Sequence, residues 1–206
     1  MKLLLFSDLH TDAQAARSLA ERSREADVVV GAGDFASARR GLSECIAILK
    51  AIACPTILVP GNNESHEELK AACHGWAQAR VLHGSGAEVG GVQFFGLGGG
   101  VPPTPFGSWS FDLSEDEAAR LLEGCPRRAV LISHSPPLGV LDASSSGQSL
   151  GSASVRRAVE QKQPVLVVCG HIHASGGQQA MLEQTPVVNA GPRGIEWTLA
   201  QATAST

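Results

Sequence analysis

The sequence has no apolar run long enough for a membrane span or a secretory signal. Its first ten residues, MKLLLFSDLH, contain one positive charge and only four consecutive strong hydrophobes before Ser7 and Asp8. A signal peptide needs about 7–15 apolar residues in its central region, and a membrane helix needs about 20. We therefore expect a cytoplasmic protein that does not insert into a membrane.

The sequence also lacks a basic cluster. Its 206 residues include 16 Lys and Arg against 20 Asp and Glu, which gives a net charge of -4 and a pI near 6.0. Surfaces that bind nucleic acid are normally rich in clustered Lys and Arg, and here these residues are scattered. The composition argues against a nucleic-acid partner and against a nuclease subunit. A small anionic substrate would need a local cation.

Paired cysteine motifs are missing as well. The five cysteines are an odd number without any CxxC pair, and most of them stand in apolar surroundings. Such a set is typical of reduced structural thiols rather than of a disulfide framework or a zinc site. We assign no metal to the cysteines, which are Cys45, Cys54, Cys73, Cys125 and Cys169.

Short runs of Val, Ile and Leu alternate with helix-patterned segments, which is typical of an α/β fold. The expected strands cover residues 3–6, 28–30, 56–59, 129–132 and 165–168. The expected helices cover roughly residues 12–25, 37–53, 64–74, 114–123 and 152–162. Two glycine-punctuated segments, 80–98 and 177–199, predict antiparallel hairpins instead of helices.

These patterns predict an α/β fold with two sheets. With 43% hydrophobic residues, the chain has enough apolar material for one sizeable core. No internal repeat stands out, and no linker is long enough to divide the chain. Our interpretation is a single domain over residues 1–206, with a tail, residues 200–206, that we expect to fray.

Each of the five expected strands is followed by residues that can bind a metal ion. The five segments are SDLH, GAGD, PGNNE, SHSPP and CGHIH. In an open α/β sheet, ligands bind beyond the carboxyl ends of the strands, so these segments should converge. Residues two apart in an extended segment project to the same side, which pairs Asp8 with His10 and His171 with His173.

The candidate ligands are a mixture of carboxylate, amide and imidazole groups. They are Asp8, His10, Asp34, Asn62, His134, His171 and His173. This set suits Mn, Fe, Zn or Co rather than metals that prefer thiolates, and it is large enough for two ions that share one bridging group. Asp34 is the natural bridge.

The order of these motifs, D-x-H, G-D, G-N-x-E, H and G-H-x-H, resembles the calcineurin-like metallophosphoesterases over the chain from Asp8 to His173. The resemblance implies a four-layer αββα sandwich of two mixed β-sheets flanked by helices. It also implies two divalent or trivalent transition-metal ions. The first ion would be held by Asp8, His10, Asp34 and His173. The second would be held by Asp34, Asn62, His134 and His171.

The same resemblance implies a reaction. A hydroxide that bridges the two ions would attack phosphorus in line, while both metals neutralise the phosphoryl oxygens. The phrase PTPFGSWSFDLSEDE is similar to a branch of small phosphoesterases described as related to cyclic-nucleotide phosphodiesterase. The leading hypothesis is a phosphodiesterase, rather than a phosphomonoesterase, for a small or nucleotide-like phosphate ester. The alternative is a non-catalytic interaction or scaffold module with the same fold.

The segment GNNE departs from the family pattern at Asn63. In the family, the residue after the ligand asparagine is commonly a histidine that stabilises the transition state or protonates the leaving oxygen. An amide cannot deliver that proton, so His66 is the candidate substitute acid, and its alternative role is a solvated helix face. By the same analogy, Glu64 supports the ligands or begins the next helix.

Other motifs have simpler readings. The segment GAGDFA superficially matches a dinucleotide-binding motif, but Asp34 would then face a pyrophosphate, so we reject that reading. The run GLGGG lacks the GK[ST] of a phosphate-binding loop. Residues 98–112 form a long loop that contains Phe106, Trp109 and Phe111. These aromatic side chains either stack on an aromatic leaving group or base, or cover the core or a dimer contact.

Overall fold

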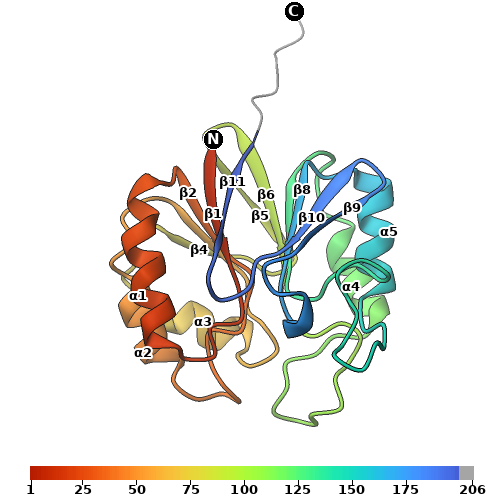
Figure 1. The fold of residues 1–206 in the computed structure, drawn as a ribbon, viewed down its shortest axis with the longest axis horizontal. Helices are drawn as coiled ribbons and strands as arrows, with labels where there is room; N and C mark the ends of the chain where they lie inside the picture. The colour runs from red at the N-terminus through yellow and green to blue at the C-terminus, as the bar shows by residue number, and fades with distance from the viewer. Residues whose placement is uncertain (200–206) are drawn as a thin grey trace, which may run out of the picture.

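The computed structural model describes residues 1–199, so the expected fraying of residues 200–206 lies outside this part of the chain. Two β-sheets pack face to face, and helices cover the outer face of each (Figure 1). This arrangement is the four-layer αββα sandwich that the family resemblance implies. Among residues 1–199, no helix is long and apolar enough to cross a membrane.

The first sheet has the strand order β11-β1-β2-β3-β4. Its parallel strands are β1 (Lys2–Phe6), β2 (Val28–Gly31), β3 (Thr56–Leu58) and β4 (Ala79–Val81), and β11 (Ile195–Thr198) pairs antiparallel with β1. The outer face of this sheet carries three helices (Figure 1), which are α1 (Ala13–Arg22), α2 (Leu42–Leu49) and α3 (His66–Ala72). The 3-10 turn η1 (Ser23–Glu25) continues α1.

The second sheet has the order β5-β6-β7-β8-β10-β9. Its parallel strands are β6 (Val92–Leu97), β7 (Val130–Ser133), β8 (Leu166–Cys169) and β10 (Thr185–Asn189). The edge strands β5 (Ser85–Val89) and β9 (Gln179–Leu182) form antiparallel hairpins with their neighbours. Helices α4 (Glu115–Leu122) and α5 (Ala153–Lys162) cover the outer face, and the turn η2 (His173–Ser175) follows β8.

The strands read as continuous apolar runs because both of their faces are buried. In β2, Val28 and Val30 belong to the core between the two sheets, whereas Val29 belongs to the core beneath α1 and α2. A third apolar cluster lies beneath α4 and α5. The alternation of strand side chains between these cores fixes the order of the layers.

One expectation about local structure is wrong, and a second is confirmed only in part. The helix predicted from residue 37 begins only at Leu42, because Ser37 and Arg40 exchange two backbone hydrogen bonds of 3.0 Å and form a tight turn. In the segment 80–98, β5 and β6 form the expected antiparallel hairpin, but the start of the segment does not belong to it. Its first strand, β4, joins β3 in parallel, and the chain then crosses to the second sheet as β5. Both differences depend on tertiary contacts that local patterns do not encode.

Candidate metal centre

The seven candidate ligands follow β1, β2, β3, β7 and β8, whose carboxyl ends lie at one end of the sandwich, the lower end in Figure 1. The first sheet contributes Asp8, His10, Asp34 and Asn62. The second sheet contributes His134, His171 and His173. The structure brings all seven together at the seam between the sheets, as the following distances show.

The first ligand group consists of Asp8, His10, Asp34 and His173, each of which offers one ligand atom. These four atoms lie within 4.8 Å of one another. His10 Nε2 is 3.5 Å from Asp34 Oδ2 and 3.0 Å from His173 Nε2. His173 Nε2 is 3.7 Å from Asp8 Oδ1. Two carboxylates and two imidazoles at this spacing fit a borderline transition-metal ion.

The second group surrounds the side-chain oxygen of Asn62. This Oδ1 atom is 3.3 Å from His134 Nε2 and 3.1 Å from His171 Nδ1. His134 Nε2 also lies 3.5 Å from Asp34 Oδ1. The two oxygens of Asp34 therefore face different groups, with Oδ2 toward His10 and Oδ1 toward His134. This is the geometry that a bridging carboxylate requires.

Backbone carbonyl groups set the tautomers of two histidines. His134 Nδ1 is 2.7 Å from the carbonyl oxygen of Ala32, and His10 Nδ1 is 3.2 Å from that of Ala36. A carbonyl oxygen can only accept, so Nδ1 is the donor in both rings. The neutral ring then has an unprotonated Nε2 that faces the site, which is the form that binds metal.

Four of the seven candidate ligands have left-handed backbone conformations. Their φ angles are 55° at Asp8, 43° at His10, 58° at Asp34 and 65° at His171. Such angles are uncommon outside glycine and cluster at functional sites. Hydrogen bonds across the site hold the strained residues: the Asp8 N–H donates to the Gly33 carbonyl at 2.9 Å, and the His171 N–H donates to Asp8 Oδ1 at 3.0 Å.

Two glycines permit this close approach. A methyl group on Gly61 would overlap the carboxylate and backbone of Asp34, and one on Gly170 would lie 2.5 Å from Asp8 Oδ2. Neither neighbour can move away, because each carboxylate belongs to the ligand group itself. The glycines in PGNNE and CGHIH are thus required by the packing of the ligand loops.

Glu64 connects the ligand loop after β2 with the ligand loop after β3. Its fully buried carboxylate accepts hydrogen bonds from the N–H groups of Asp34 at 2.9 Å, Ala36 at 2.9 Å and Gly61 at 2.7 Å. Burial, together with the nearby charge of Asp34, raises the pKa of Glu64 to about 7. Glu64 therefore supports the ligand loops after β2 and β3 rather than facing the site.

The electrostatics of the site favour a positive charge beside Asp34. Burial alone would raise the pKa of Asp34, but His134 and His10 hold that pKa well below its usual range. Burial opposes the protonation of His134, yet the Asp34 carboxylate raises the pKa of His134 to about 9. Burial and the charge of His134 lower the pKa of His171 to about 3. A metal cation would supply the same positive charge.

The family profile of the calcineurin-like phosphoesterase superfamily domain matches residues 1–206. The chain belongs to this superfamily. A search of curated proteins found no match. Among solved structures, the fold is similar to TT1561 of Thermus thermophilus, with a TM-score of 0.74 and 18% identity over 92% of this chain and 88% of that one.

Two further solved structures have a similar fold. A dimetal phosphatase from Danio rerio has a TM-score of 0.61 and 16% identity over 92% of this chain and 86% of its own. The phosphopantetheinyl hydrolase of Mycobacterium tuberculosis has a TM-score of 0.57 and 16% identity over 92% and 88%. At identities this low, the similarity shows the fold alone.

Asn63 is held by the protein at both ends of its amide. Its side-chain nitrogen donates to Asp34 Oδ2 at 2.7 Å, and its side-chain oxygen accepts from the Ala38 N–H at 2.7 Å. Its backbone N–H donates to Asp34 Oδ1 at 2.9 Å. The residue is 8% exposed. Asn63 thus orients the carboxylate that faces both ligand groups.

His66 lies at the first position of α3, outside the ligand groups. Its ring packs against His83 with a centroid separation of 5.5 Å, and its Nδ1 lies 3.3 Å from Glu67 Oε1. Within residues 1–199, no hydrogen bond joins His66 to a candidate ligand. Burial, together with the charge of His66, lowers the pKa of His83 to about 4. The structure does not bring His66 into the cluster.

Sequence reasoning missed the residue that orients Asn62. The Asn62 side-chain nitrogen donates to Ser110 Oγ at 3.0 Å, which leaves Oδ1 directed at His134 and His171. Ser110 in turn donates to Asp112 at 2.9 Å. Ser110 and Asn62 are separated by 48 positions, so no local motif could have linked them.

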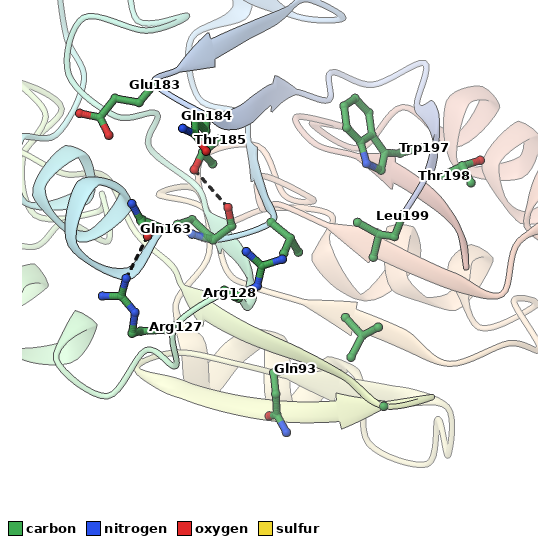
Figure 2. A pocket seen from close by; sticks show the side chains of 14 residues that line it. Gln93, Arg127, Arg128, Gln163, Glu183, Gln184, Thr185, Trp197, Thr198 and Leu199 are labelled. Atoms are coloured by element: carbon green, nitrogen blue, oxygen red, sulfur yellow. Dashed lines mark hydrogen bonds between the residues drawn. The ribbon is translucent and has the colours of Figure 1, made fainter. Parts of the chain in front are cut away.

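Cavity size does not locate this centre. A depression of about 760 Å³ lies at the opposite end of the strands, between Arg127, Arg128, Gln163 and the end of β11, and candidate ligands are absent from its described lining (Figure 2). A smaller depression of about 330 Å³ opens beside Asp8, His10 and His173. The chemistry of the lining, and not the volume, identifies the candidate site.

Proposed function

We propose that the protein is a metal-dependent hydrolase of small phosphate esters that works with two transition-metal ions. Asp8, His10, Asp34 and His173 would hold one ion. Asp34, Asn62, His134 and His171 would hold the other. One observation carries the proposal: the two oxygens of Asp34 face two separate groups of metal-binding atoms, at 3.5 Å on each side. The donor set suits Mn, Fe, Zn or Co.

When bound, the two ions would supply a hydroxide nucleophile at neutral pH and offset the charge of the phosphoryl oxygens. The chain's own residues prepare the site. The carbonyl groups of Ala32 and Ala36 hold the Nδ1–H of His134 and His10, so that Nε2 of each neutral ring faces the site. Asn63 and Glu64 fix the Asp34 loop, so little reorganisation is needed when a substrate arrives.

We further propose a diester, rather than a monoester, as the substrate class, with a small or nucleotide-like group. The similarity of PTPFGSWSFDLSEDE to the cyclic-nucleotide phosphodiesterase branch supports this proposal. The same segment presents Phe106 and Trp109 as an exposed stacked pair with centroids 5.5 Å apart. A stacked aromatic pair can receive a planar group such as a nucleobase.

The test combines metal analysis with a substrate panel. Purified protein is loaded with Mn²⁺, its metal content is measured, and hydrolysis of bis(4-nitrophenyl) phosphate is compared with that of 4-nitrophenyl phosphate. We expect faster turnover of the diester, loss of activity with a chelator, and loss in His134→Ala. The matched control is His74→Ala, which removes an exposed histidine outside the site.

Each part of the proposal has its own contrary result. Bound metal without turnover of either ester would favour the scaffold alternative. Faster turnover of the monoester would overturn the diester preference while leaving the hydrolase intact. Equal activity in His134→Ala and His74→Ala would remove His134 from the site.

A further inference from the structure

The depression of about 330 Å³ is continuous with the first ligand group. Asp8, His10 and His173 form one part of its lining. The remainder comes from two loops, residues 176–177 after η2 and residues 190–195 between β10 and β11. A ligand bound at the first group could therefore extend into this depression without displacing any side chain.

Glycines keep this space open. Gly177 and Gly191 have φ angles of 82° and 62°, and a methyl group on Gly177 would meet no atom within 4 Å. Their N–H groups are already used: that of Gly177 donates to the Asn189 carbonyl at 2.9 Å, and that of Gly191 donates to Ser7 Oγ at 2.9 Å. The N–H groups of these two glycines are therefore not available to a ligand.

Arg193 is the one lining residue with a permanent positive charge. It is exposed, and within residues 1–199 its guanidinium takes part in no hydrogen bond or ion pair. Its backbone, in contrast, is anchored, because Arg22 Nη1 donates to the Arg193 carbonyl at 2.5 Å. Arg22 also pairs with Glu196 of β11 at 3.2 Å.

Arg39, in the turn after β2, differs from Arg193. Arg39 pairs with Glu68 and donates to the Trp109 carbonyl at 2.5 Å, so its charge is compensated. The guanidinium of Arg193, in contrast, has no hydrogen-bond or ion-pair partner among residues 1–199. Guanidinium groups bind phosphate and carboxylate with paired hydrogen bonds.

We propose that this depression is an anion subsite, in which Arg193 binds a second anionic group of the substrate, separate from the phosphate that is hydrolysed. The proposal rests on the proposed function and narrows its substrate class. The preferred substrate is a phosphate ester whose other arm carries a phosphate or a carboxylate. A substrate whose other arm ends in a neutral group forms no ion pair with Arg193 and gains no affinity from it.

Two non-hydrolysable ligands of equal chain length test the proposal by titration calorimetry on the Mn²⁺-loaded protein. Propylphosphonate carries one anionic end, and 1,3-propanediphosphonate carries two. We expect the diphosphonate to bind about tenfold more tightly, as one charge-assisted contact allows. Arg193→Gln should remove this preference and leave propylphosphonate binding unchanged, and Arg193→Lys should retain part of it.

Arg24→Gln is the matched control, because Arg24 is an exposed arginine in η1, away from the depression, and its loss should change neither affinity. An unchanged preference in Arg193→Gln, or equal affinities of the two ligands in the wild type, would overturn the subsite. If propylphosphonate binds and the diphosphonate binds no more tightly, the anion subsite is wrong but the proposed function stands. Arg193-dependent binding of the diphosphonate without metal-dependent binding of propylphosphonate would instead retain the subsite and contradict the proposed function.

Discussion

Asn63 holds the central carboxylate of the site with two hydrogen bonds, one from its backbone and one from its side chain. Because its amide oxygen also accepts from Ala38, the residue links the ligand loop after β3 to the turn after β2. An amide has no proton to give at neutral pH. We propose that, at the residue scale, an amide that positions Asp34 stands where related proteins commonly have a histidine that could handle protons.

This replacement predicts a strong dependence of hydrolysis on the leaving group. General acid assistance is worth on the order of 10²–10⁴-fold, and it matters most for basic leaving oxygens. We expect ready turnover of nitrophenyl diesters and much weaker turnover of alkyl or ribose esters. Asn63→His should selectively improve the poor leaving groups, and His66→Ala should harm them if His66 is the substitute acid.

The measurement is kcat/KM over a series of esters with graded leaving-group basicity. Wild type, Asn63→His and His66→Ala are compared, with His74→Ala as the control for the loss of a histidine. Equal sensitivity to leaving-group basicity in all these proteins would mean that neither position handles the proton. Asn63 would then act only by orienting Asp34.

At the element scale, the aromatic loop of residues 98–112 is fastened to the second ligand group. The Phe111 N–H donates to the Asn62 carbonyl at 2.9 Å, and Ser110 receives the Asn62 side chain. Phe106 and Trp109 remain outside the core, with 53% and 36% of their surface exposed. The loop is thus anchored at Ser110 and Phe111, whereas its aromatic tip, Phe106 and Trp109, is exposed.

Trp109→Ala tests whether this tip receives substrate. Because the side chain is exposed, its loss should leave the melting temperature and the metal content unchanged. KM should rise for aromatic and nucleotide esters, with little change in kcat. Met181→Ala, which removes an exposed apolar side chain on β9, is the control. A lower melting temperature with unchanged kinetics would assign Trp109 a structural role instead.

The sequence predicts a helix or strand correctly where the residues of that segment are sufficient to determine its structure. The run Val28–Val30 is a strand because β-branched residues are buried on both of its faces. Helix α4 begins where expected because Ser114 and Glu117 form a reciprocal capping box. The helix predicted from residue 37 failed because Asn63, far along the chain, binds Ala38 and Arg39 in a turn.

The candidate site also has features that the local sequence predicts and features that depend on distant contacts. Motif order and strand ends are sufficient to predict which residues gather at one end of the sandwich. The contacts that orient them are not local. Ser110 meets Asn62, and Arg193 reaches the depression beside His173, only after both sheets have formed. Such contacts join segments that are far apart in the sequence, so no local pattern encodes them.

At the scale of the whole molecule, the candidate centre joins the two sheets. His10 of the first sheet meets His173 of the second, and Asp34 meets His134 in the same way. An ion held between such pairs binds the assembled sandwich and not the separated sheets, so binding stabilises the folded state. Asp34 contributes to both ligand groups and is therefore the residue on which the whole arrangement depends.

Equilibrium Mn²⁺ binding to the wild type and to Asp34→Asn, measured by dialysis and elemental analysis, tests this claim most directly. Asn63→Gln is the control for local disturbance, because it alters the amide beside Asp34 but keeps the carboxylates of Asp8 and Asp34. We predict two ions per chain in the wild type and weakened binding at both sites in Asp34→Asn, since one carboxylate supplies charge to each ion. Two ions per chain bound to Asp34→Asn with wild-type affinity would contradict the account.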